Sequence, residues 1–167
     1  MKKICFLSLF FLVVAGCASV PVNVLIADFE TQQSAANFQS TPGKARVYFV
    51  GGRMGNAISL PATMVGGAEL SINGFPIGQI DRNDVLVADI APGDYTFSWK
   101  YPSGDSTTEF VQKRVSGSDI VLLQATWFTG GIATPAKYEI SEVFDRALFA
   151  NKRIVLPTRC PNSICTP

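Results

Sequence analysis

Four cysteines are the residues of this 167-residue chain whose type and spacing point most directly to chemistry. Cys5 lies inside an apolar run, Cys17 stands at the end of that run, and Cys160 and Cys165 are separated by four residues in "RCPNSICTP". A cysteine thiol can carry a lipid, form a disulfide, bind a metal or attack a substrate. The residues around each thiol decide among these chemistries.

The N-terminus has the three parts of a cleaved signal peptide. Lys2 and Lys3 form a short positive region, residues 4 to 14 are almost entirely apolar, and Ala15-Gly16 supply the small residues that processing needs. The run is shorter than the roughly 20 residues of a permanent membrane helix. A buried helix of the core would have a polar face, which this run lacks. We therefore expect residues 1–16 to be a signal peptide.

The segment "Val14-Ala15-Gly16-Cys17" resembles the lipoprotein box of bacterial envelope proteins. The resemblance implies that Cys17 is lipidated and becomes the first residue of the mature chain. More than one acyl chain would then hold it, as stable anchoring requires. Because no Asp follows at Ala18 or Ser19, the same resemblance favours the outer membrane, facing the periplasm, over the inner one. The alternative is ordinary secretion with Cys17 as a free thiol.

Cys160 and Cys165 are expected to form a disulfide, because an exported chain meets an oxidising compartment. Closing this small loop would contribute about 2 kcal/mol, and less if it joined only a frayed tail. A structural zinc site usually needs four Cys and His ligands, whereas the chain has no histidine. A redox pair would need the C-x2-C spacing. No metal or other cofactor is predicted.

Charge and composition exclude several classes of function. Without histidine, Ser-His and Cys-His catalytic arrangements cannot form, and most aspartates fall at expected turns, where they satisfy backbone groups. Removing residues 1–16 leaves 12 basic and 13 acidic residues, a net charge of −1, which gives no electrostatic reason to expect nucleic acid. We expect a protein that is not an enzyme. Its partners would be the membrane, through the lipid, and an unidentified envelope protein.

The chain is expected to divide into three segments after the signal peptide. Residues 17–43 would form the lipidated N-terminus and a tether, 44–156 a β-sandwich domain, and 157–167 a tail that holds the disulfide. Within the tether, "VNVLIADF" is too apolar for a pure linker and could add a short strand or dock on the core. Short strands recur every 8 to 12 residues or so between Gly, Pro and Asp turns, as in all-β sandwiches. We predict a mainly β fold, a single antiparallel β-sandwich, with a short helix from Asp145 to Lys152 near the C-terminus.

Asn73-Gly74 is the strongest turn signal of the domain. The alternating segment "AELSI" (68–72) stops at Asn73, and "FPIGQI" (75–80) begins after Gly74. Both turn residues tolerate positive φ, so the pair predicts a two-residue β-hairpin. Because Pro76 has no N–H to donate, the second strand should lie at a sheet edge or contain a bulge.

A row of aromatic side chains runs along "DYTFSWKY" (94–101), at alternate positions that share one face of a strand. Such a row is most often part of a core, because large aromatic rings dominate burial. If the row were exposed, it could instead form a platform for a sugar ring. The row consists of Tyr95, Phe97, Trp99 and Tyr101, of which Tyr95, Trp99 and Tyr101 are the candidate ligand contacts.

Three segments, "KARVYFV" (44–50), "LSINGFPIGQI" (70–80) and "APGDYTFSW" (91–99), resemble a family of bacterial envelope lipoproteins built on a domain of unknown function. The resemblance covers about residues 38 to 145, and its second part is also similar to small prealbumin-like sandwich modules. It implies a prealbumin-like β-sandwich and supplies no catalytic residue. The expected function is a membrane-anchored envelope lipoprotein that acts as a structural or protein-interaction module. The alternative is a module that binds a glycan or small ligand on the aromatic face or the 51–67 loop.

Overall fold

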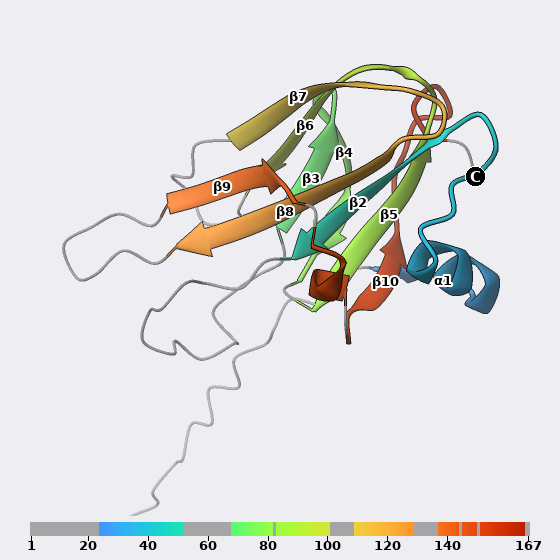
Figure 1. Cartoon of the computed structure of the whole chain (residues 1–167). Coiled ribbons are helices and arrows are strands. Elements are labelled where there is room, and N and C mark those ends of the chain that lie inside the picture. The colour runs from blue at the N-terminus through green and yellow to red at the C-terminus, as the bar shows by residue number, and fades with distance from the viewer. Residues whose placement is uncertain are drawn as a thin grey trace, which may run out of the picture.

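Two β-sheets pack face to face in the computed structural model of this protein (Figure 1). It describes residues 24–51, 68–81, 83–100, 109–128, 137–143, 145–149 and 151–165, and the structural statements below refer to these. Cys17 and residues 52–67 lie outside the described residues. Within them, no helix is long and apolar enough to span a membrane.

The first sheet has six strands and the second has four. In spatial order, the first contains β1 (Leu25–Ile26), β10 (Arg153–Leu156), β5 (Asp84–Ile90), β2 (Ala45–Gly51), β8 (Ile120–Phe128) and β9 (Lys137–Glu142). The second contains β4 (Phe75–Ile80), β3 (Ala68–Ile72), β6 (Gly93–Lys100) and β7 (Glu109–Val115). One α-helix, α1 (Phe29–Ala36), precedes β2.

The predicted β-sandwich is confirmed, but its strands are not all antiparallel. The four-stranded sheet is antiparallel throughout, whereas the six-stranded sheet is mixed, because β2 pairs with β8 and β5 with β10 in parallel. Parallel neighbours need a long crossover connection. Here the crossover from β2 to β8 and the one from β5 to β10 both run through strands of the other sheet. A chain that leaves a sheet and returns can re-enter it in either direction.

The Asn73-Gly74 hairpin is confirmed. Asn73 and Gly74 have φ values of 51° and 79°, and they join β3 to β4 with Ile72 opposite Phe75. The Asn73 side chain also accepts a hydrogen bond from the Thr96 N–H of β6 at 2.8 Å. The turn is therefore held both by its own backbone preference and by the neighbouring strand.

Pro76 has the position that its missing N–H requires. It lies in β4, an edge strand of the four-stranded sheet, beside a register shift in which Leu70 faces Gly78 while Ser71 faces Pro76. Both expected accommodations, an edge and a bulge, occur together.

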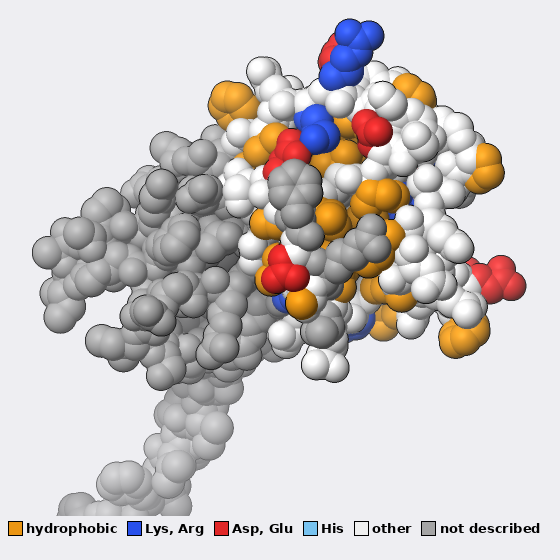
Figure 2. All heavy atoms as spheres, in the orientation of Figure 1, with side chains coloured by type: hydrophobic (Ala, Val, Ile, Leu, Met, Phe, Trp, Pro, Cys, Tyr) orange, Lys and Arg blue, Asp and Glu red, His pale blue; other side chains and the backbone are white. Residues whose placement is uncertain are grey.

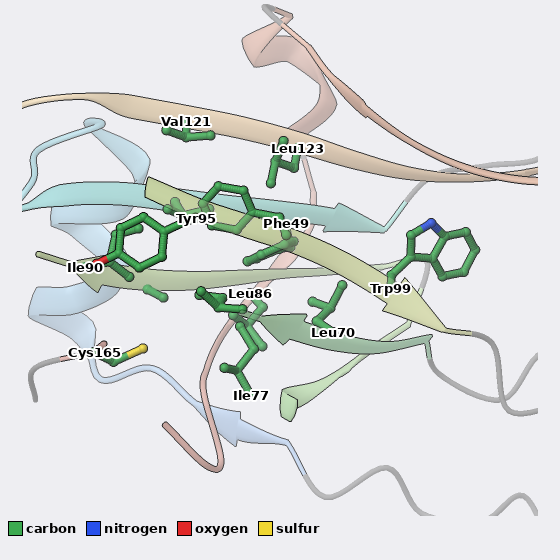
Figure 3. Close-up of a cluster of buried hydrophobic side chains, with 14 of the residues drawn as sticks. Phe49, Leu70, Ile77, Leu86, Ile90, Tyr95, Trp99, Val121, Leu123 and Cys165 are labelled. Carbon is green, nitrogen blue, oxygen red and sulfur yellow. The ribbon is translucent and has the colours of Figure 1, made fainter. Parts of the chain in front are cut away.

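The main core lies between the two sheets (Figure 3), and the aromatic row contributes to it. Tyr95, Phe97 and Trp99 are buried. Phe97 meets Phe49 of β2 edge to face, with ring centroids 5.8 Å apart. The interpretation of these three rings as core is confirmed, and they do not form an exposed platform. Tyr101, the fourth ring of the row, lies outside the described residues.

A second, smaller apolar cluster covers the outer face of the six-stranded sheet. All seven residues of β2 are buried, so this strand is covered on both faces. On the outer face the Tyr48 ring contacts Phe38 and Phe149, with centroids 5.1 and 5.2 Å away. Its hydroxyl donates a hydrogen bond to the Ala35 carbonyl of α1 at 2.9 Å.

The expected helix at Asp145 to Lys152 is replaced by a shorter element. Only Arg146–Phe149 is helical, as a single 3₁₀ turn. Asp145 still acts at its start, where its carboxylate accepts a hydrogen bond from the Ala147 N–H at 2.8 Å. Arg153–Leu156 already belongs to β10, so little chain remains for an α-helix before that strand.

Part of the segment expected to be a tether is built onto the sandwich. β1 pairs with β10 at the edge of the six-stranded sheet. Asp28 is the N-cap of α1, and its carboxylate accepts a hydrogen bond from the Thr31 N–H at 2.7 Å. The helix buries Ala35. These elements lie in the segment 17–43 that was expected to be a tether.

The predicted disulfide between Cys160 and Cys165 is confirmed, and it lies against the core rather than on a frayed tail. After β10, the backbone N–H groups of Thr158 and Arg159 both donate to the Ile77 carbonyl of β4, at 3.0 and 3.3 Å. Ile164 and Cys165 are buried in the main core. The backbone of Cys165 also pairs with Ile90 of β5 in an isolated antiparallel β-bridge. The tail thus joins the two sheets at this side.

Candidate functional site

A groove of about 620 Å³ opens along the edge of β5. β10 pairs with β5 only from Asp84 to Leu86. The next backbone pairing on this side of β5 is the β-bridge between Ile90 and Cys165. Between these two contacts, residues 87–89 of β5 line the groove. The site exists because β10 is too short to cover the whole of β5.

Two elements that are distant in sequence form the sides of the groove. One side is α1, which contributes Glu30, Thr31 and Ser34. The other is the C-terminal tail, with Asn162 and the Cys160–Cys165 disulfide. The disulfide therefore fixes the shape of one wall as well as the tail.

The floor of the groove contains a buried ion pair. Arg46 of β2 faces Asp89 of β5 in register, and its Nε and Nη2 atoms donate to the two Asp89 oxygens at 2.6 and 2.7 Å. The Thr41 hydroxyl also donates to Asp89, and Arg46 Nη1 donates to the Ser34 hydroxyl at 2.9 Å. The pair thus ties α1 and the segment before β2 to the sheet.

The ion pair stabilises both charged forms. Burial opposes ionisation of Asp89, but the hydrogen bonds from Arg46 and Thr41 outweigh it and hold the pKa of the carboxyl below its usual value. The hydrogen bonds to Asp89 raise the pKa of the Arg46 guanidinium. Asp89 is therefore a carboxylate committed to internal partners, and a fixed charge pair of this kind serves position rather than proton transfer.

The entrance of the groove combines apolar and polar side chains. Leu25 of β1 and Leu156 of β10, followed by Pro157, line it, and Glu30 and Asn162 are exposed beside it. Ligand sites commonly have this mixture of apolar lining and a few fixed polar groups. Among the described residues, no group of three or more His, Cys, Asp or Glu side chains is placed to hold a metal ion.

The sequence predicts one part of this site, the disulfide that forms one wall. Arg46 and Asp89 were not predicted as site residues, although each interrupts an otherwise apolar strand, in "KARVYFV" and "VLVADI". A charge within a buried strand needs a partner, and two such interruptions could have been paired. The candidate contacts Tyr95 and Trp99 are in the core, away from the groove.

Comparison with protein-family models, curated proteins and solved structures finds no match to this chain.

Proposed function

We propose that this protein is a bacterial envelope lipoprotein, anchored through Cys17 in the outer membrane and facing the periplasm. Its domain acts without catalysis, by contacting another envelope protein. The N-terminal signal pattern and lipoprotein box support the anchor, and a disulfide suits an oxidising compartment.

The observation that carries the interaction role is the groove along β5. It has a rigid floor, because the Arg46–Asp89 pair is held by four side-chain hydrogen bonds to Asp89 and Ser34. Its charged floor is neutralised within the fold, while Glu30 and Asn162 at the rim remain exposed. A preformed recess with adaptable rim groups is suited to recognition.

The anchor is tested on the mature protein isolated from envelope fractions. Mass spectrometry should find Cys17 as the first residue, carrying a diacylglyceryl thioether and an N-acyl chain. Cys17→Ser should leave an unprocessed or unanchored precursor. A mature chain that begins at another residue without lipid contradicts the anchor.

The interaction role is tested by site-specific photo-crosslinking in cells. A photoreactive residue at Glu30 should capture a defined envelope protein, and the same residue at Phe110, which is exposed on β7, serves as the control. Adding Asn162→Trp, which fills the opposite rim, should abolish capture from position 30. Equal capture from positions 30 and 110, or capture that Asn162→Trp leaves unchanged, contradicts a contact in the groove.

The second candidate function is the binding of a small ligand or glycan in the groove, and the volume of the groove favours it. A volume of about 620 Å³ falls within the range of small-molecule sites. Because Tyr95 and Trp99 are buried, a ligand would bind in the groove and not on the aromatic face. Soluble peptidoglycan fragments should then raise the melting temperature of the parent protein and have no effect on Asn162→Trp.

A further inference from the structure

Exposed apolar side chains are concentrated at the start of the described chain. Among the large hydrophobic residues that the structure describes, five are exposed, and three of these occur within five consecutive positions. Leu25, Ile26 and Phe29 are 52%, 55% and 77% exposed; we call them the N-terminal patch. Single exposed hydrophobic residues are ordinary, whereas a cluster of large ones marks a contact surface.

The fold holds the patch in its exposed position. Leu25 and Ile26 form β1, which pairs with β10 and is the edge strand of the six-stranded sheet. Their side chains point to opposite faces, so together they cover both sides of this edge. Phe29 is the first residue of α1, fixed there by the Asp28 cap. It lies about 120° around the helix from Ala35, which α1 buries. In Figure 2 an apolar and an acidic side chain protrude at the α1 end of the molecule.

The position of the lipid anchor brings this patch to the membrane. Six residues lie between Cys17 and Val24, where the described chain begins, so the seven Cα-to-Cα steps between these two residues span at most about 25 Å. The other end of the sandwich lies farther away. There β9 is the sheet edge opposite β1, and the Lys113–Glu142 ion pair joins it to β7, which carries Phe110.

We propose that the N-terminal patch docks into the surface of the bilayer that holds Cys17, so that the lipid and the patch together fix the orientation of the domain. This inference rests on the proposed anchor at Cys17. The acyl chains at Cys17 hold the chain at the membrane, and apolar contact by the patch would add to that attachment. The partner of the patch is the lipid surface itself.

The charges around the patch determine the kind of lipid contact. Asp28 and Glu30 flank Phe29 and are exposed, so an anionic surface would repel this end of the domain. Docking is therefore apolar, and neither anionic lipid nor low salt strengthens it. Leu25 belongs to both the patch and the groove, so docking places one rim of the groove at the membrane surface. A protein bound there would be embedded in that membrane or lie on it.

The experiment uses the full mature lipoprotein, reconstituted in vesicles and labelled with an environment-sensitive fluorophore. Cys17 is taken by lipid and Cys160 by Cys165, so Phe29→Cys adds the single free thiol. Phe110→Cys is the matched control, since Phe110 is also exposed. Brominated phosphatidylethanolamine should quench the fluorophore at position 29 by about threefold or more relative to position 110. Replacing part of the lipid with phosphatidylglycerol should not increase the quenching.

Each outcome separates the docking from the anchor. Equal quenching at positions 29 and 110 in a protein whose lipid at Cys17 is confirmed by mass spectrometry overturns the docking and leaves the anchor standing. Absence of lipid at Cys17 overturns the anchor, and the docking with it. A shielded fluorophore at position 29 without vesicles, dependent on protein concentration, would show contact with a second copy and also overturn the docking.

Discussion

Arg46 and Asp89 face each other across β2 and β5, and the guanidinium of Arg46 holds both carboxylate oxygens of Asp89, at 2.6 and 2.7 Å. The two side chains are only 7% and 12% exposed. Each charge would be unfavourable alone in this position, because burial removes its water. The pair, with Ser34 and Thr41, therefore connects α1 to the sheet at the floor of the groove.

Asp89→Asn should destabilise the domain by about 3–5 kcal/mol at neutral pH. The substitution keeps the size of the side chain but leaves the buried Arg46 guanidinium without an opposite charge. Glu142→Gln is the control, because its pair with Lys113 is about one third exposed and should contribute less than about 1 kcal/mol. Urea unfolding measures both. A loss no larger for Asp89→Asn than for Glu142→Gln would contradict the structural role of the pair.

The Arg46–Asp89 pair should also make the free energy of unfolding depend on pH in the acidic range. Hydrogen bonds from Arg46 and Thr41 overcome the effect of burial and lower the pKa of Asp89 below the usual 3.8. The unfolded chain binds the proton more readily, so the contribution of Asp89 is complete above about pH 4 and is lost as the pH falls through the lower folded value. The difference in unfolding free energy between the parent protein and Asp89→Asn should therefore narrow from pH 6 to pH 3. A difference in unfolding free energy that stayed constant from pH 6 to pH 3 would contradict this contribution of the Asp89 carboxylate.

Reduction of the disulfide should loosen the groove as well as the tail. By loop closure alone, Cys160→Ser with Cys165→Ser should cost about 2 kcal/mol. The buried Ile164 and the Ile90–Cys165 bridge depend on the same segment, so the measured loss should not fall below that figure. Thermal unfolding with and without reductant checks it. If reductant left the midpoint of the parent protein unchanged while labelling showed two free thiols, the disulfide would have no structural role.

Local patterns predicted the elements of this fold better than their arrangement. The strands Ala68–Ile72 and Phe75–Ile80, and the turn at Asn73-Gly74 that joins them, follow from residue type and alternation. Alternation determines which face of a strand is buried but not which strand lies beside it. The parallel pairings of β2 with β8 and of β5 with β10 depend on long connections, and no local signal encodes them.

The groove could not be predicted for a related reason. It arises where β10 ends beside β5 and the tail returns at Ile90, so it is a property of three segments together. The burial of β2 on both faces is visible in the continuous run from Val47 to Val50. That run indicates that something covers the outer face, but it does not identify α1 and Phe149 as the cover.

Trp99 tests whether the aromatic row serves the core. Its side chain lies between the sheets, opposite Leu70 of β3, and the residue is only 4% exposed. Trp99→Ala should therefore remove apolar contacts and leave a cavity, at a cost of about 3–5 kcal/mol. For a domain of ordinary marginal stability this is a large part of the total free energy of unfolding.

Phe110→Ala is the matched control, because it also removes a large ring. That ring is exposed in the described structure, so its loss should change stability by less than about 0.5 kcal/mol. Chemical denaturation measures both variants. If Trp99→Ala were as stable as Phe110→Ala and instead lost binding to a glycan, the Trp99 ring would act in recognition. The binding site would then have to be assigned to the aromatic strand and not to the groove.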